Sequence, residues 1–385
     1  MNEDIARAKR YSRIKNRLIL ANLALTFAFL IIMHSLGISN SLKGLVMGWA
    51  ENFYLQIALY VTFFFGVFYI ITFFLDLYDG FFVEHKFSLS NQTFLGWLKD
   101  NLKKETLSFI IFLLVVELIY LCLRFFPTHW WLLAAAGWVG LTIVFSKIAP
   151  VLIIPLFYKC LPLRNLGLKE RLLRLSEASG CPIKEVFEIN LSKTTKRANA
   201  GLAGMGNTRR IILSDTLLSN YSDEEIEAVM AHELGHFRMH HLWKLLGIGA
   251  GLALIGFYLT YLTLGWATDL FGYEGIADIA AFPILSLIFL ILGLLIMPIQ
   301  NGFSRHLEKE ADHFSLEQMK TTQPFCSAMT KLSQQNLRDP SPGKFVEVVL
   351  YDHPPISKRL NYAREFEACQ RGQTSTFNKR EHFAG

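Results

Sequence analysis

The chain has 385 residues, of which 52% are hydrophobic and only 18% carry a charge. Soluble globular proteins average about 45–50% apolar and about 25% charged residues, so this composition excludes a disordered chain, a collagen and a small disulfide-rich module. The net charge of +6 does not require nucleic acid, because basic residues beside membrane spans are a common source of positive charge. We therefore expect a membrane protein with no nucleic-acid partner.

Apolar stretches long enough to cross a bilayer recur along the chain. The hydrocarbon core requires about 20 mostly apolar residues in a helix. Four stretches contain no acidic or basic residue, and two contain one each, Glu117 and Lys147. The sequence therefore predicts a polytopic α-helical membrane protein with six spans, near residues 18–42, 52–75, 106–123, 125–158, 245–268 and 279–304.

Basic residues gather in alternate segments between the predicted spans. The N-terminal tail, the loop 76–105, the segment 159–241 and the tail after residue 304 are rich in Lys and Arg. Because such residues concentrate in cytoplasmic loops, both termini and both large polar segments are predicted to lie in the cytoplasm. The pattern fits a bacterial inner membrane and an endoplasmic reticulum equally well.

The order of spans and polar segments divides the chain into four parts. Residues 1–158 are expected to form an N-terminal membrane domain with four spans, and residues 242–304 a two-span hairpin. Residues 159–241 and 305–385 are expected to be the two halves of one split cytoplasmic domain, the second half ending in a tail.

The first polar segment combines strand and helix patterns. An apolar strand is predicted at Val186–Ile189, and a β-hairpin is predicted with arms at 198–203 and 208–213. The connecting Gly-Met-Gly-Asn at 204–207 has the composition of a tight turn. Ser222 and Glu225 form a capping box, which predicts the start of a helix. The split domain is therefore expected to be α+β.

The capped helix contains the sequence His-Glu-Leu-Gly-His. His232 and His236 are four residues apart, so both imidazoles share one helix face and can reach one Zn²⁺. Glu233 lies beside them, where it can take a proton from water. The alternative is a pair of histidines on a solvated helix face. His240 and His241 follow closely, and we interpret them as ordinary membrane-surface histidines.

A third metal ligand is predicted from the position of the last span. Met239 and Leu242 stand where a metzincin would have Gly and His. Glu308 follows the sixth span, and the two-span hairpin returns it to the membrane face that carries the histidines. Two His and one carboxylate leave a fourth position open for water, as in thermolysin. Asp312 could orient a ligand histidine, or it could only pair with Lys309.

Two further side chains are candidates for stabilising an oxyanion. Hydrolysis of a peptide by attack on its carbonyl creates a negative charge that needs donors. His353 and Arg359 lie in a His-Pro-Pro segment that precedes a basic helix, although such a segment is often a plain loop.

The order and spacing of these motifs resemble the type 1 CAAX prenyl protease family. The resemblance extends from about residue 77 to residue 363. The motifs that carry it are the Ala-Pro-Val-Leu-Ile-Ile-Pro-Leu-Phe run at 149–157, Asn199-Ala200 before a glycine-containing turn, the Arg-Ile-Ile-Leu-Ser-Asp-Thr-Leu-Leu run at 210–218, the HELGH sequence at 232–236, the Ser-Arg-x-x-Glu-x-x-Ala-Asp run at 304–312, and His353-Pro354-Pro355 with Arg359.

The resemblance implies a gluzincin-type zinc metalloendopeptidase whose spans surround an intramembrane cavity. It implies that His232, His236 and Glu308 bind one Zn²⁺ and that Glu233 is the general base. Asp312 would support one of the ligands.

The resemblance also implies roles in binding the substrate and the transition state. His353 and Arg359 would stabilise the transition state. Asn199, Ala200 and Gly204 would belong to an edge strand that pairs with an extended substrate, which agrees with the predicted hairpin.

The family cleaves the C-terminal tripeptide from prenylated proteins, so a peptide or protein substrate and membrane lipid are the expected partners. One alternative is a quality-control metalloprotease that acts on membrane or misfolded proteins without a prenyl preference. A second is a transporter or receptor with a structural zinc. Family members usually have seven spans, and the span at 18–42 matches their second, so we expect the earliest span to be missing.

Glu117 is a separate candidate, because an ionisable group inside a span is costly and often functional. We favour the interpretation that it faces the cavity or a helix interface without a catalytic role.

Overall fold

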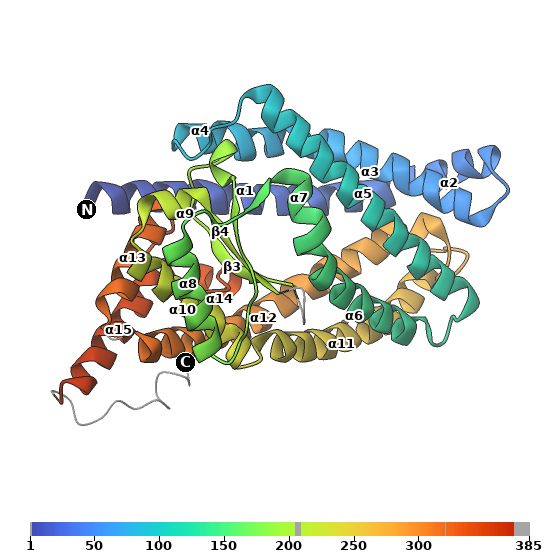
Figure 1. Ribbon diagram of the computed structural model, residues 1–385. Coiled ribbons are helices and arrows are strands. Elements are labelled where there is room, and N and C mark those ends of the chain that lie inside the picture. Colours follow the sequence, from blue (N-terminus) through green and yellow to red (C-terminus); the bar gives the residue numbers. More distant parts are fainter. Residues whose placement is uncertain (1, 205–208, 320, 373–385) are drawn as a thin grey trace.

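Long helices form one end of the molecule, and a small sheet with shorter helices forms the other (Figure 1). The computed structural model describes residues 2–204, 209–319 and 321–372. The long helices extend to the right in Figure 1, while the sheet and the shorter helices gather at the left. The predicted combination of a helical membrane part with a small α+β domain is confirmed.

Six helices in the described part of the chain are long and apolar enough to cross a membrane, which confirms the predicted number. Three of them are extended at one end by a short π-helical or 3₁₀-helical segment. The six are α1 (Asn2–Ser35), α3 (Phe53–Leu77) with η1 (Tyr78–Val83) and α4 (Glu84–Lys86), α5 (Phe94–Phe125), α6 (Trp130–Ile148) with η2 (Ala149–Ile153) and α7 (Ile154–Phe157), α11 (His241–Leu270), and α12 (Phe282–Gln318) preceded by η5 (Ile279–Ala281).

The first span ends earlier than the uncharged stretch 18–42 suggests. Helix α1 stops at Ser35, and a second helix, α2 (Ile38–Trp49), starts after Gly37. Gly37 has φ +67°, a left-handed conformation that glycine adopts without steric cost. Helix α2 has 12 residues and is about 18 Å long, too short to cross a hydrocarbon core of about 30 Å.

An apolar cavity of about 810 Å³ lies among the spans. Its walls come from α1, α3, α5, α6, α11 and α12 and are rich in aromatic side chains, including Phe29, Phe64, Phe112, Phe257 and Phe289. The predicted arrangement of spans around an intramembrane cavity is therefore confirmed.

The sheet has four strands in the order β1 (Cys160–Pro162), β2 (Val186–Ile189), β4 (Arg210–Ser214) and β3 (Ala200–Ala203). Strands β2 and β4 are parallel, and the two outer pairings are antiparallel. The order places β3 at one edge of the sheet. The outer side of β3 is therefore available for pairing with another extended chain.

The predicted hairpin arms are paired as β3 and β4. Ala200 pairs with Leu213 and Ala203 with Arg210, and residues 205–208, where the turn was predicted, lie outside the described residues. Strand β3 starts two residues later than predicted. The reason is that the N–H and the C=O of Ala198 both bond to the side-chain amide of Asn336, each at 3.1 Å.

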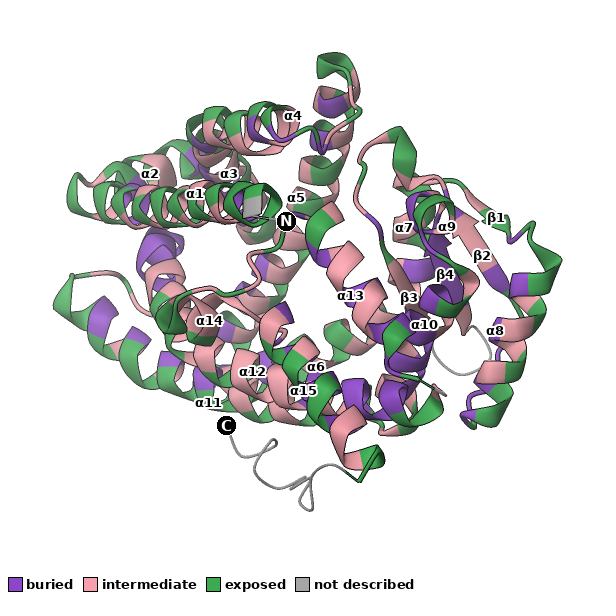
Figure 2. Ribbon diagram, turned by 90° about the vertical axis from the view of Figure 1, so that its left-hand side faces the viewer, coloured by how far each residue is buried: buried purple, intermediate pink, exposed green. Residues whose placement is uncertain are grey.

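One hydrophobic core joins segments from both sides of the α11–α12 hairpin. It contains Leu213 and Leu234 from the first segment and Phe314, Phe325 and Phe366 from the second. The helices that pack around it are α8 (Leu166–Ala178), α9 (Asp215–Asn220), α10 (Asp223–Arg238), α13 (Gln323–Gln335) and α15 (Ile356–Gln370). The same two segments also contain the short helices η3 (Leu191–Lys193) and α14 (Lys344–Leu350). Figure 2 shows α10 as one of the most buried helices, beside β3 and β4.

Candidate metal centre

Helix α10 holds the two histidines of the HELGH sequence in a fixed position. Its start is stabilised by the predicted capping box, in which Ser222 and Glu225 each bond to the other's backbone N–H, a cap that contributes about 1 kcal/mol. Glu225 is also tied to Lys331 of α13, at 2.7 Å. His232 and His236 lie on one face, with their Nε2 atoms 3.2 Å apart.

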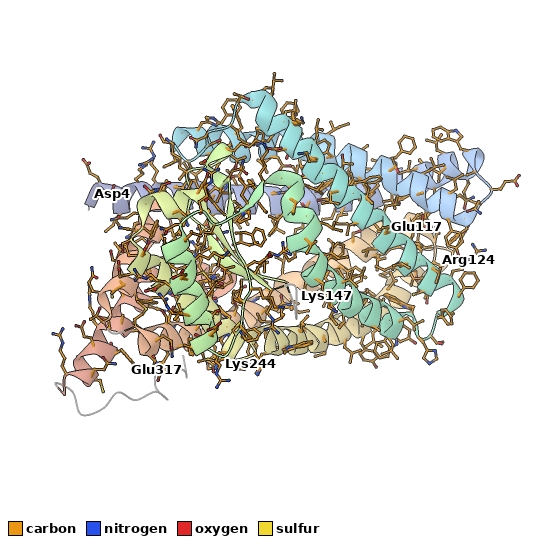
Figure 3. The ribbon with its side chains drawn as sticks, viewed as in Figure 1. Asp4, Glu117, Arg124, Lys147, Lys244 and Glu317 are labelled. Carbon is orange, nitrogen blue, oxygen red and sulfur yellow. The ribbon has the colours of Figure 1, made fainter. Side chains whose placement is uncertain are left out.

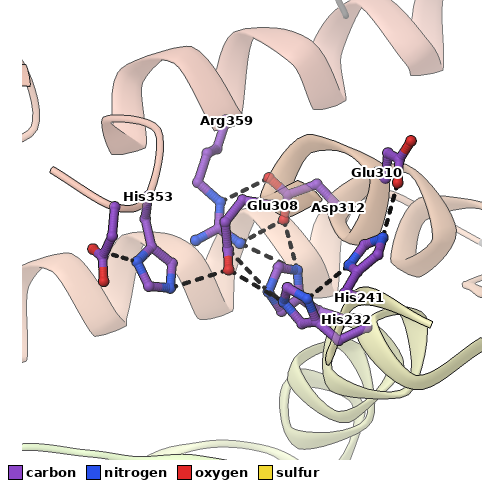
Figure 4. Close-up of polar contacts among 9 residues, drawn as sticks. His232, His241, Glu308, Glu310, Asp312, His353 and Arg359 are labelled. Atoms are coloured by element: carbon purple, nitrogen blue, oxygen red, sulfur yellow. Dashed lines mark hydrogen bonds and ion pairs between the residues drawn. The ribbon is translucent and has the colours of Figure 1, made fainter. Parts of the chain in front are cut away.

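Glu308 of α12 completes a cluster of three donor groups (Figure 4). Its carboxylate oxygens lie 3.3 Å from His232 Nε2 and 3.2 Å from His236 Nε2. The contact with His232 uses Oε2 and the contact with His236 uses Oε1. Two atoms bound to one tetrahedral ion at about 2.0–2.1 Å are about 3.3 Å apart, so each histidine nitrogen lies at such a distance from the other histidine nitrogen and from one oxygen of the carboxylate. Glu308 Oε2 is buried and has no hydrogen-bond partner within the described residues. These three residues are the one group in the described chain whose donors converge in this way.

Gly235 allows α10 and α12 to approach closely enough for this cluster. A methyl group at this position would lie 3.1 Å from Phe314 Cβ and 3.2 Å from Ala311 Cα. Both residues belong to α12, the helix that carries Glu308. The glycine inside the HELGH sequence therefore has a packing function.

Gly235→Ala is expected to lower the stability of the protein by about 1–3 kcal/mol, because the added methyl group overpacks the helix contact. The melting temperature of the detergent-solubilised protein measures this effect. Gly247→Ala in α11 is the matched control, since a methyl group there meets nothing within 4 Å and alanine favours a helix. Equal melting temperatures for the two variants would contradict the packing role of Gly235.

Asp312 and Arg359 form a buried pair behind His232. Asp312 Oδ1 lies 2.9 Å from His232 Nδ1, so the carboxylate accepts the Nδ1–H and leaves Nε2 free for a metal ion. Arg359 of α15 donates to both oxygens of Asp312, with Nε at 2.8 Å from Oδ2. The structure thus shows Asp312 in contact with His232, one of the two histidines that the sequence suggests as ligands. Arg359 contacts Asp312 directly.

The carboxylates around His232 favour a positive charge at this position. Burial by itself lowers the pKa of His232, but the hydrogen bond with Asp312, the close contact with Glu308 and the charges of both carboxylates raise the pKa to about 10. The centre is therefore built to hold a cation, which a proton or a metal ion can supply.

His353 lies at the same centre. Its Nε2 is 3.2 Å from Glu308 Oε1, and its Nδ1 is 2.7 Å from Asp352, a contact that lowers the pKa of that carboxyl group. The segment is held by Arg305 of α12, whose Nη1 donates to the carbonyl oxygens of Tyr351 at 2.6 Å and of Glu347 at 3.0 Å. Arg305 belongs to the motif that carries Glu308, but no pattern in the sequence indicates this contact.

The edge strand β3 passes over Glu233. A methyl group at Gly201 would lie 3.9 Å from Glu233 Oε2. Asn199 precedes the strand and is anchored through its backbone N–H, which donates to Ser214 Oγ at 2.9 Å. Ala200 is the first residue of the strand, and Gly204 follows its last residue with φ +89°. The strand that the predicted substrate-binding residues form or flank therefore lies next to the predicted base.

His241 is not an ordinary surface histidine, and that expectation is wrong. It is 1% exposed and lies 2.9 Å from His236, Nδ1 to Nδ1. The exposed His240 has φ +57° and turns the chain between α10 and α11. This turn brings the first residue of the membrane helix against the metal centre, a proximity that no periodicity indicates.

Glu117 lies within the span α5 (Figure 3). Its Oε2 is buried and has no hydrogen-bond partner within residues 2–204, 209–319 and 321–372. No hydrogen bond or ion pair in that part of the chain joins Glu117 to the candidate metal centre. Its position agrees with the interpretation that gives it no catalytic role.

The geometry defines a class of protein: a polytopic membrane protein with a possible His-His-Glu metal site next to an edge strand. Comparison with known families identifies the family. A family model described as peptidase family M48 matches residues 162–367, and one described as CAAX prenyl protease N-terminal, five membrane helices, matches residues 1–159. The chain belongs to peptidase family M48.

Named relatives and a solved structure agree with this assignment. The chain is 31% identical to the uncharacterized metalloprotease YhfN of Bacillus subtilis over 368 residues, which cover 94% of this chain and 86% of the relative. It is 30% identical to a CAAX prenyl protease 1 homolog of Arabidopsis thaliana over 298 residues, 74% of this chain and 68% of the relative. The crystal structure of S. mikatae Ste24p has the same fold, with a TM-score of 0.83, 24% identity and coverage of 94% and 89%.

The protein is therefore a multi-pass membrane metallopeptidase that acts on peptides or proteins. The expectation of a hydrolase is confirmed, and the alternative of a transporter or receptor is wrong. Residues 1–159 contain four of the six candidate spans and the short helix α2.

Proposed function

We propose that the protein is a zinc endopeptidase in which His232, His236 and Glu308 bind one Zn²⁺. The observation that supports this proposal is the convergence of the three side chains: the two histidine Nε2 atoms lie 3.2 Å apart, and each lies 3.2–3.3 Å from one oxygen of the Glu308 carboxylate. Bound zinc would supply a Lewis acid that polarises a peptide carbonyl and lowers the pKa of water. Two imidazoles and one carboxylate are a donor set suited to catalytic zinc.

Glu233 is the proposed general base. It follows the first ligand in the sequence, and its carboxylate faces β3. In this position it can accept a proton from the attacking water and return it to the leaving amine. A carboxylate that faces the strand and follows a proposed ligand in the sequence is suited to both transfers.

The outer edge of β3 is the proposed binding site for an extended peptide. The edge is formed by Ala200–Ala203, preceded by Asn199 and followed by Gly204. Backbone hydrogen bonds to this edge would hold the substrate in register, and they depend little on its side chains. The scissile carbonyl would then lie between Glu233 and the metal ligands.

His353 and Arg359 are proposed to stabilise the oxyanion in different ways. His353 lies beside Glu308 and donates its Nδ1–H to Asp352, so its Nε2 can donate a hydrogen bond to the oxyanion when the ring is an imidazolium. Arg359 is buried, and its guanidinium is bonded to Asp312. Its contribution is the positive charge that it brings to the site and the position that it gives to Asp312.

We further propose that the substrates are prenylated proteins. Relatives from Arabidopsis thaliana and Saccharomyces cerevisiae are named CAAX prenyl protease 1 homolog and CAAX prenyl protease 1. The apolar cavity of about 810 Å³ between the spans provides surroundings suited to an isoprenoid chain. A quality-control protease without prenyl preference is the alternative, and the named relatives do not favour it.

Paired peptides test this proposal. A peptide with a farnesylated cysteine four residues from its C-terminus is expected to be cleaved with a kcat/KM at least 10-fold higher than the same peptide with S-methylcysteine, a difference of about 1.4 kcal/mol. Mass spectrometry of the products gives the rate and the cleavage site. Equal rates for the two peptides would remove the prenyl preference and leave the endopeptidase proposal intact.

The metal centre is proposed to face the cytoplasm, because the basic segments lie on its side of the predicted spans. In a cysteine-free background, Glu274→Cys between α11 and α12 is expected to react with a membrane-impermeant maleimide added to intact cells. Arg174→Cys in α8 is expected to react only after permeabilisation. Both side chains are well exposed, 80% and 69%. The opposite labelling pattern would reverse the proposed orientation.

A further inference from the structure

A second chain of hydrogen-bonding groups reaches the metal centre from the start of α11 (Figure 4). His236 Nδ1 lies 2.9 Å from His241 Nδ1, and His241 Nε2 lies 2.8 Å from Glu310 Oε2. Lys244, one turn further along α11, lies 2.8 Å from the same oxygen. The four groups therefore form a continuous path from a metal ligand to an ion pair.

The direction of these hydrogen bonds follows from the chemistry of the groups. The Glu310 carboxylate can only accept, so His241 carries a hydrogen on Nε2 and donates it. The charge of Glu310 is already matched by Lys244, so a neutral His241 suffices, and its Nδ1 is then an acceptor. His236 must donate its Nδ1–H to that acceptor. This leaves the lone pair of His236 Nε2 directed at Glu308 and His232.

We propose that His241 is a positioning residue for the metal ligand His236, and that Glu310 fixes the tautomer of His241. The proposal rests on the proposed function, in which His236 binds zinc. It gives the second histidine ligand an orienting partner, as Asp312 is for His232. The two partners differ in origin, because Asp312 belongs to α12 and His241 is the first residue of α11.

Asparagine and glutamine at position 241 distinguish the contribution of Nδ1 from that of Nε2. His241→Asn keeps an acceptor near the place of Nδ1, whereas His241→Gln keeps a donor near the place of Nε2. His241→Leu keeps neither. If the acceptor for His236 is what matters, Gln and Leu are expected to raise the Kd for zinc about 10–100-fold, and Asn is expected to leave it within about 3-fold.

Competition with a fluorescent chelator measures the Kd in the detergent-solubilised protein, and the visible spectrum of the Co²⁺-loaded protein reports the ligand geometry. The spectrum is expected to change in His241→Gln and His241→Leu and to stay as in the wild type in His241→Asn. His240→Asn is the matched control, since that neighbour is exposed and asparagine tolerates its left-handed backbone. It should change neither measurement.

A second pair of variants covers the case in which position 241 tolerates no change. Glu310 is one-quarter exposed. Glu310→Gln keeps an acceptor for His241 and should bind zinc normally, whereas Glu310→Ala should bind about 10-fold more weakly. Unchanged affinity in His241→Leu and Glu310→Ala, or equal losses in His241→Asn and His241→Leu, would overturn the positioning role alone. A wild-type protein that binds no zinc would overturn the proposed function and this inference together.

Discussion

Replacing Glu233 with glutamine is expected to lower kcat for peptide cleavage about 100- to 10,000-fold, the range that general acid–base catalysis contributes, while one equivalent of zinc remains bound. The side chain keeps its size but loses the ability to accept a proton. It is not one of the three converging donors, so the metal centre should be unaffected. Cleavage assays together with elemental analysis of the purified variant provide both values.

The matched control for this substitution is Glu224→Gln in the first turn of the same helix. Its side chain is 56% exposed and contacts Arg171 on the surface. This variant should cleave at the wild-type rate. Wild-type turnover in Glu233→Gln would show that another group takes the proton, and loss of zinc from it would show that Glu233 also supports the metal.

Replacing Glu308 with glutamine is expected to abolish both zinc binding and cleavage. The substitution removes the only anionic member of the proposed ligand set and leaves His232, His236 and His353 facing a neutral amide. The loss of affinity should exceed the roughly 10–100-fold effect of losing an outer-shell partner. Elemental analysis after dialysis against a chelator measures it.

Comparison of this variant with Glu233→Gln distinguishes a ligand from a base. Both variants should be inactive, but zinc should be lost from the Glu308 variant alone. Glu317→Gln, on the same helix and with a side chain 45% exposed, is the control that should keep zinc and activity. A Glu308→Gln protein that retains one equivalent of zinc would assign the third ligand to a different residue.

Much of the architecture and the arrangement of the site follows from patterns in the sequence. Span number depends on the length of uncharged stretches, which is a local property, and the described chain has six such helices. The prediction that Glu308 lies near the histidines used the span count as well, because two consecutive spans return the chain to the same membrane face. His232 and His236 share a face because they are four residues apart on a helix.

The features that were missed depend on contacts between distant segments or on single backbone angles. The link between Ala198 and Asn336 joins residues 138 positions apart, and no periodic pattern encodes it. The end of the first span depends on the left-handed conformation of Gly37. The burial of His241 depends on a left-handed His240, where a non-glycine residue gives no sign of a turn. Turns are predicted from residues such as glycine, and His240 is not one of them, so His241 was expected on the surface.

Helix α12 links the lipid bilayer to the chemistry in one continuous element. It has 37 residues and is therefore about 55 Å long, whereas the hydrocarbon core is about 30 Å thick. The same helix has the length and composition to cross the membrane, and its last turns, beyond Pro298, carry Glu308 and Asp312. Those turns pack closely against α10 at Gly235. A single helix therefore joins the membrane part of the protein to the packing that keeps Glu308 next to the two histidines.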